Sequence, residues 1–172
     1  MSIGNQIGLD ELFAYKNQLI GDIWTNKTIV DLITEDEHLR KHPEELVYKQ
    51  VFPWEKVPGT TEVATTYVCI EVDVKNVLDK TYLEPIIYVW IFTHESLYRL
   101  PNGGGVRYDK IASEIVKILN GSRMYGIGEL NLSSVRKLSP IDHYQGRTLS
   151  FITKEYNRIG QSGKAVPANR RS

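Results

Sequence analysis

Histidine stands close to serine or aspartate at two places in the chain, as the base and nucleophile of a hydrolase must do in space. Ser96 lies near His94, and His143 follows Asp142 directly. Residues this near in sequence rarely point at one reacting atom, and no GxSxG nucleophile elbow is present. Cys69 lies inside a predicted strand, without a helix N-terminus beside it, which favours a packed thiol over a nucleophile. We therefore expect no catalytic residue, and a protein that is not an enzyme.

Two further motifs have the residue types of ligand sites. His38 and His42 have the spacing at which two imidazoles on one helical face share a metal. Pro43 ends that helix, however, and neither an HExxH motif nor a cysteine pair accompanies them. The glycines at 103–105 precede a predicted helix whose N–H groups can hold phosphate, but the loop lacks the GK[ST] ending of a P-loop. The sequence favours surface histidines and a flexible loop, so we expect no metal and no cofactor.

Two apolar segments predict strands. In residues 66–74, valine and isoleucine alternate with outward residues that include Tyr67, Glu71 and Asp73, which is the period of a half-buried strand. Residues 86–92 are apolar on both faces, which is typical of a central strand covered from both sides. The outward carboxylates are either an ordinary solvated face or, if the domain lines a channel, groups that repel phosphate and let DNA slide past.

Composition restricts the class of protein. The length of 172 residues suits one domain. With 21 basic and 21 acidic residues, the chain lacks the basic excess by which the body of a protein grips nucleic acid. The longest uncharged apolar run, residues 85–93, is far shorter than the roughly 20 residues of a transmembrane helix. The N-terminus lacks a secretory signal pattern, and the lone cysteine fits a reducing compartment. We expect a cytosolic protein with no membrane partner.

Helical and strand patterns alternate along the chain. Apolar residues recur at helical spacing in residues 9–20, 28–33 and 109–120, and Gly21 is expected to weaken or end the first helix. Residues 45–51, 127–135 and 147–153 have strand alternation. The link 75–84 is too long for a tight hairpin, and antiparallel pairing of the strands it joins is the simplest arrangement. The order α-β-β-α-β-β predicts an α+β fold, an antiparallel β-sheet with helices packed on a face.

The C-terminal residues differ in composition from the rest. Residues 1–159 are expected to form a single domain, and residues 160–172 a polar, basic tail with almost nothing to bury. The tail carries Lys164, Arg170 and Arg171. We expect it to become ordered only against neighbouring chains in an assembly.

Several segments together resemble one family. They are FPWEKVPGTTE before TYVCIEVDV, the strand IIYVWIFTHESL, the helix VRYDKIASEIVKILNGS after the glycine loop, and the closing IGELNLSSV and YQGRTLSFITKEYN. They are similar to the tail terminator and head-to-tail joining proteins of tailed bacteriophages, particularly those of Gram-positive hosts. The similarity covers roughly residues 10–158 and lies in hydrophobicity and turn patterns. The link 75–84 and the tail from Gly160 match no pattern of that family.

The resemblance implies a virion protein of the phage neck or tail, assembled in the cytoplasm of the host bacterium. Such a subunit forms a homo-oligomeric ring, commonly a hexamer, around the DNA channel. The ring caps the tail tube protein and docks to the head-closure or connector protein, and genomic DNA passes through without specific binding. By the same resemblance the sheet supplies the inner wall and subunit contacts, while the loop 94–106 reaches towards the tube or connector. The candidates for lumen or subunit interface are Tyr67, Glu71 and Asp73, and those for the docking loop are His94, Arg99, Asn102, Gly103, Gly104, Gly105 and Arg107.

Two alternatives remain open. Another structural protein of the same particle, such as a tail tube protein or a head-closure stopper, is the nearer one. A small-molecule enzyme would need a pocket with convergent polar groups, which His94, Arg99, Arg107 and Asp109 are placed to supply.

Overall fold

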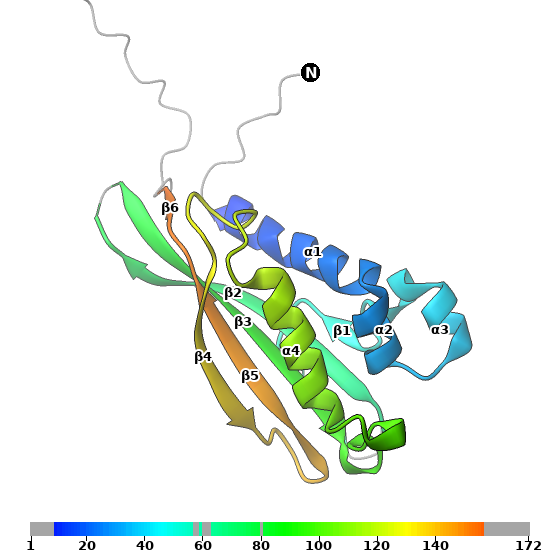
Figure 1. The fold of residues 1–172 in the computed structure, drawn as a ribbon. Coiled ribbons are helices and arrows are strands. Elements are labelled where there is room, and N and C mark those ends of the chain that lie inside the picture. The colour runs from blue at the N-terminus through cyan, green and yellow to red at the C-terminus, as the bar shows by residue number, and fades with distance from the viewer. Residues whose placement is uncertain (1–8, 57–58, 60–62, 80, 157–172) are drawn as a thin grey trace, which may run out of the picture.

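The computed structural model describes residues 9–56, 59, 63–79 and 81–156. These residues form one six-stranded, mostly antiparallel sheet with α1, α2 and α4 packed on one face (Figure 1). The predicted α+β fold is confirmed. The expected boundary at residue 159 and the tail residues Lys164, Arg170 and Arg171 lie outside the described residues.

The helices differ from the sequence pattern mainly at their ends. α1 (Leu9–Thr25) continues through Gly21, which was predicted to weaken or end it. The buried residues Leu19, Ile20 and Ile23 hold its last turns against the core, and this packing outweighs the cost of one helical glycine, about 1 kcal/mol. The other helices are α2 (Lys27–Ile33), α3 (Glu37–Lys41) and α4 (Arg107–Leu119), and the short 3-10 helices are η1 (Pro43–Leu46), η2 (Glu95–Leu97) and η3 (Pro101–Gly103). No helix of the described residues is both long and apolar enough to cross a membrane.

The sheet has the strand order β1-β2-β3-β5-β4, and β6 pairs with the end of β3. Its strands are β1 (Val51–Phe52), β2 (Thr66–Val77), β3 (Tyr82–His94), β4 (Asn131–Leu138), β5 (Tyr144–Ile152) and β6 (Glu155–Tyr156). The predicted antiparallel pairing of β2 with β3 is confirmed, and only β1 with β2 is parallel. The strand predicted at 45–51 is wrong for most of its length, because Pro43 starts a 3-10 helix there and only Val51 joins the sheet.

The link at 75–84 is shorter than expected, since it was predicted to be too long for a tight hairpin. β2 continues to Val77 and β3 begins at Tyr82, so the connection is a short hairpin rather than a long loop. The Asp79 carboxylate closes the turn by accepting hydrogen bonds from the backbone N–H groups of Thr81 and Tyr82, at 2.5 and 2.8 Å. An aspartate that accepts from the chain just after it stabilises a turn without a special backbone conformation.

The main core lies between the sheet and the helices. Alternate residues of β2, β3 and β5 face it. Of the residues predicted to form one stripe of α4, Ile111, Ile115 and Leu119 are buried against them and Ile118 is only partly buried. In the part of the chain that the structure describes, helices cover this face only. The expectation that β3 is covered on both faces is therefore met only in part, because Tyr88 and Trp90 on the other face are half-buried.

Candidate assembly surface

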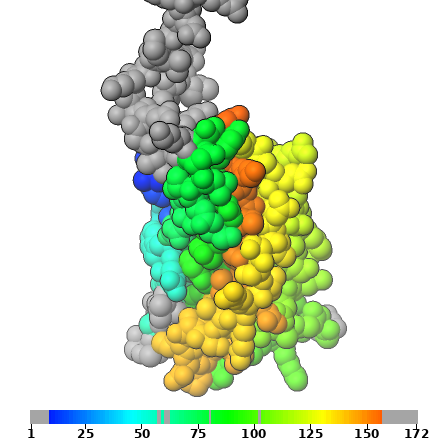
Figure 2. Space-filling model, turned by 90° about the vertical axis from the view of Figure 1, so that its left-hand side faces the viewer, coloured from blue at the N-terminus to red at the C-terminus, as the bar shows by residue number. Residues whose placement is uncertain are grey.

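The sheet face opposite the helices carries a cluster of aromatic side chains. Figure 2 shows part of this face, where β2, β3, β5 and β4 lie side by side and helices appear only at the margins. The residues that share the cluster are Phe52, Tyr67, Cys69, Phe92 and Tyr144, with Trp90, Leu138 and Ile141 packed against them. These residues form a second, smaller core on the open face of the sheet.

The aromatic cluster continues to the surface. Trp54 is 46% exposed and Tyr48 is 64% exposed, and their rings stack with centroids 5.6 Å apart. On β3 the rings of Tyr88 and Trp90 also stack, 5.6 Å apart. Soluble monomers seldom display contiguous aromatic surface, and such patches usually mark contact sites.

Cys69 lies within this cluster and is fully buried. Burial raises the pKa of its thiol to about 11, although a hydrogen bond with the Lys56 backbone opposes the shift. The ammonium of Lys56 lies 4.7 Å from the ring centroid of Phe52 and 5.3 Å from that of Tyr67. The thiol is therefore a packed group that stays protonated at neutral pH, as the sequence predicts.

The three predicted interface residues share the open face but differ in exposure. Tyr67 is only 3% exposed, because the aromatic cluster surrounds it. The Glu71 carboxylate forms an ion pair with Lys16 of α1 and accepts the backbone N–H of Val72 at 3.1 Å. Asp73 is exposed. Of the three, Asp73 is the side chain most accessible to a partner.

The loop 94–106 is tied closely to the body. The Leu100 N–H donates to the Gly105 carbonyl at 3.0 Å, and Gly103 and Gly105 adopt positive φ values of 74° and 88°, which glycine allows. Gly104 and Arg99 are exposed, and Asn102 lies in η3. The glycines thus serve the backbone geometry of a compact turn.

Arg107 belongs to this loop in sequence but points inward. Its guanidinium is buried and donates to the carbonyls of Leu97 and Leu32, both at 2.9 Å, and to the Glu35 carboxylate at 2.5 Å. Asp109 instead accepts from Arg147 at 2.6 Å. These two candidate pocket residues are engaged in separate structural pairs, and they do not converge with His94 on one cavity.

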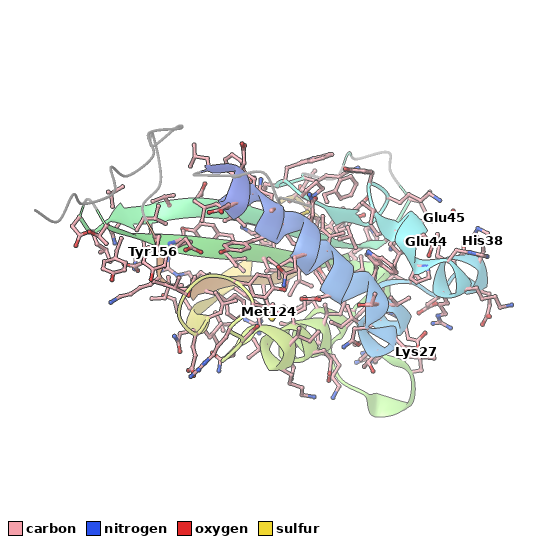
Figure 3. All side chains as sticks on the ribbon, turned by 90° about the horizontal axis from the view of Figure 1, so that it is seen from above. Lys27, His38, Glu44, Glu45, Met124 and Tyr156 are labelled. Atoms are coloured by element: carbon pink, nitrogen blue, oxygen red, sulfur yellow. The ribbon has the colours of Figure 1, made fainter. Side chains whose placement is uncertain are left out.

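The histidines flagged by the sequence form two surface groups. His94 Nδ1 lies 2.8 Å from the Ser96 hydroxyl, whereas His143 pairs with Glu95 at 2.7 Å, so no carboxylate orients the His94–Ser96 pair. At the other group His38 lies 3.0 Å from Glu45. His38, Glu44 and Glu45 gather at the end of the molecule away from Tyr156 (Figure 3). Within the described residues no three potential metal ligands lie together.

One family accounts for most of the sequence. Its model, YomW, matches residues 26–153, well over half of the chain. The chain belongs to the YomW family. This family is phage-associated, in agreement with the coarser part of the resemblance, and the match names no tail terminator. No curated protein matches the chain.

The YomW match begins at Asn26, the N-cap of α2, and ends at Thr153, just after β5. It leaves out α1, yet α1 supplies Leu12, Leu19, Ile20 and Ile23 to the core. α1 also provides Lys16, which reaches Glu71 on the open face. In this YomW-family chain the segment before the match therefore both completes the core and fixes a residue of the candidate surface.

Sequence reasoning missed the free edge of the YomW-family sheet. The strand predicted at 127–135 lies at Asn131–Leu138, which brings Arg136 and Lys137 onto an outer strand, beside the exposed Val135. Beside this strand lies a hollow of about 440 Å³, where apolar residues such as Val116, Val135 and Leu149 alternate with polar ones such as Ser113 and Lys117. The available sequence signal was Val135, a valine among polar residues. The position of β4 at the edge depends on the strand order, which the alternation of residue types does not reveal.

Proposed function

We propose that this protein is a structural subunit of a phage particle that forms a homo-oligomeric ring, of about six copies, at the end of the tail tube. The ring caps the tube and provides the surface to which the head connector docks, with the genome passing through its lumen. It makes and breaks no covalent bond.

The observation that carries the proposal is the one-sided sheet. Helices cover one face, and the other face holds a small aromatic core that reaches the surface at Trp54, Tyr48 and Tyr88. A subunit contact typically hides about 800 Å² on each partner. At roughly 25 cal/mol per Å² of apolar area, such burial offsets much of the cost of association.

Membership of a phage-associated family supports the same conclusion. So does the use of the polar side chains, since Arg107, Asp109 and His143 each contact an oppositely charged or hydrogen-bonding side chain of the same chain rather than converging on one site. A formal net charge of zero also suits a wall past which DNA must slide, because a strongly basic wall would hold the phosphates.

Native mass spectrometry of the purified chain tests the ring. We expect one closed oligomer of several copies at micromolar concentration, with a ring visible by negative-stain microscopy. A monomer under these conditions would overturn the ring, and long cylinders would instead identify a tail tube protein.

The role in joining is tested in the phage that encodes the protein. A stop codon early in the gene should yield filled heads and unjoined tails, and adding the purified protein to that lysate should restore infectivity. A lysate that lacks tails altogether would point to the tube protein. Normal, infectious particles would refute a structural role in the neck.

A further inference from the structure

Among the described residues, the outer side of β4 and the outer side of β2 beyond Cys69 have no neighbouring strand. β4, eight residues long, is an outer strand, and on its free side the structure shows one bond, from the Leu132 N–H to the Asn120 side chain at 2.9 Å. At the other end β1 pairs with β2 only at Val68 and Cys69, so within the described residues no strand lies beside residues 70–77. Each edge is interrupted once by a bulge, between Val74 and Asn76 on β2 and between Leu132 and Ser134 on β4, so the regular stretches are residues 70–74 and 134–138. Such free edges are templates for a strand from another chain.

Strand directions make these edges compatible. β2, β3, β5 and β4 alternate in direction, so β4 runs antiparallel to β2 of its own chain. In a ring whose axis lies along the strands, every copy of β2 points the same way. β4 of one copy then meets β2 of the next in antiparallel orientation, which is the more stable pairing.

The backbone groups of the two edges also match. Val68, Ile91, Arg147 and Lys137 lie in one row across the sheet. Val68 donates its N–H outward, to the Gln50 carbonyl at 2.8 Å. Because antiparallel pairs alternate strictly, Lys137 at the far end of the row also points its N–H and C=O outward. By the same alternation, the backbone N–H and C=O groups of Val135 on β4, and of Val72 and Val74 on β2, point away from the sheet.

One register satisfies these constraints with complementary side chains. Placing Val74 opposite Val135 sets two incompletely buried valines together on the helix side of the sheet. It sets Val72 opposite Lys137, both with outward backbone groups. It also sets Asp73 opposite Arg136 on the open face, at a position without ladder hydrogen bonds, where facing side chains come closest. Both charged side chains are exposed in the monomer.

We propose that the ring closes by strand pairing, with residues 135–138 of β4 in each copy antiparallel to residues 71–74 of β2 in the next copy and Asp73 opposite Arg136. The occupant of each free edge is a second copy of this chain. This inference rests on the proposed ring. It assigns to Asp73 a salt bridge between subunits, and it adds Val135, Arg136 and Lys137 to the interface.

In the single chain, the Glu71 side chain occupies a backbone hydrogen-bond donor at the β2 edge. Its carboxylate accepts the outward N–H of Val72 while Lys16 neutralises it. In the paired state the Lys137 carbonyl accepts that N–H, and the carboxylate keeps Lys16 as its partner. The bond from the Val72 N–H to the Lys137 carbonyl replaces its bond to the Glu71 carboxylate. Glu71 therefore hinders pairing of this edge with other strands but does not prevent assembly.

Disulfide trapping tests the register. In the variant carrying Asp73→Cys and Arg136→Cys, mild oxidation should produce a ladder of covalent oligomers on a non-reducing gel, up to the full ring. Each single variant should give no ladder beyond a dimer. A matched pair, Asp73→Cys with Lys41→Cys, places the second thiol on α3, at an exposed position away from β4, and should give no ladder beyond a dimer.

Charge reversal at the same two positions provides a second test of the register, which does not depend on assembly of the cysteine variant. Asp73→Arg should raise the concentration needed for assembly about tenfold, since like charges then face each other, and adding Arg136→Asp should restore it. If native mass spectrometry finds a ring but neither cross-linking nor charge reversal has an effect, the strand pairing is wrong and the proposed function stands. If the unmodified chain is a monomer, both are wrong.

Discussion

At the scale of single residues, Arg107 shows how a side chain can belong to one segment and serve another. It follows the glycine loop in sequence, but its guanidinium lies among η2, the end of α2 and Glu35. Two backbone carbonyls depend on it as a donor. Its exposure of 3% makes direct contact with a partner impossible without unfolding the loop.

Arg107→Ala should therefore lower the free energy of unfolding by about 2–4 kcal/mol, because it leaves two carbonyls unsatisfied. Urea unfolding followed by circular dichroism measures this loss. Arg99→Ala, at an exposed position in the same loop, is the control and should change stability by less than about 0.5 kcal/mol. Equal effects from the two variants would contradict the structural role.

Buried titratable groups predict a loss of stability in alkali. Burial raises the pKa of Cys69 from 9.0 to about 11, and burial together with the hydrogen bond to Asp22 raises that of Tyr125. The unfolded chain releases these protons at lower pH than the folded chain, so the folded state is favoured below pH 9 and loses this advantage as the pH rises. For Cys69 the loss should reach about 2–3 kcal/mol between pH 9 and 11.

The measurement is the urea midpoint at pH 8, 9, 10 and 11. Cys69→Ala should be less stable at pH 8 but should show a shallower decline above pH 9. An unchanged slope in that variant would mean that the thiol does not contribute to the alkaline transition.

At the scale of elements, the contact between β3 and β5 sets the geometry of the open face. Gly146 on β5 pairs with Phe92 on β3, inside the aromatic cluster. A Cβ at Gly146 would lie 1.7 Å from the backbone oxygen of Ile91. The strands can pair here only because position 146 has no side chain.

Gly146→Ala should consequently destabilise the domain by more than about 3 kcal/mol or prevent folding, because backbone rather than a flexible side chain must give way. Gly128→Ala is the matched control, since its nearest neighbour would lie at 3.7 Å, an ordinary contact. Thermal unfolding of both variants distinguishes the cases. A cooperative transition at the wild-type temperature for Gly146→Ala would show that the two strands can separate locally.

At the scale of the whole molecule, the described residues provide two kinds of surface for the contacts that we propose. One is the pair of sheet edges, and the other is the aromatic face around Trp54. A ring needs both kinds of contact, because edge pairing sets the neighbour and its register, while apolar burial supplies most of the free energy.

Trp54→Ala should leave the fold intact and weaken assembly, because Trp54 is already 46% exposed in the single chain. Mass photometry across a dilution series should show the oligomer dissociating at a higher concentration. Met124→Ala is the control, since Met124 is 66% exposed but lies between α4 and β4, outside the aromatic cluster (Figure 3). Equal weakening by both variants would argue against the aromatic face as the contact.

Most of the fold follows from local patterns in the sequence. The alternation in 66–74 and 86–92, and the stripe of Ile111, Ile115 and Leu119, are set by periods of two and 3.6 residues, which depend only on neighbours along the chain. They predict the α+β class and the face that each strand turns to the helices, whereas the antiparallel β2–β3 pair was inferred from the link between the two strands. They also placed Tyr67, Glu71 and Asp73 on one face.

The tertiary structure alone decided which of these residues a partner can reach. Tyr67 is covered by aromatic residues from other strands, Glu71 is held by Lys16 from a helix 55 positions earlier, and Arg107 finds Glu35 at a separation of 72. The free edges also appear only once the strand order is known, because the order puts β5 between β3 and β4. Such contacts join distant parts of the chain, so no local pattern predicts them. The strands and helices that carry them can be predicted, because each depends on the pattern within its own segment.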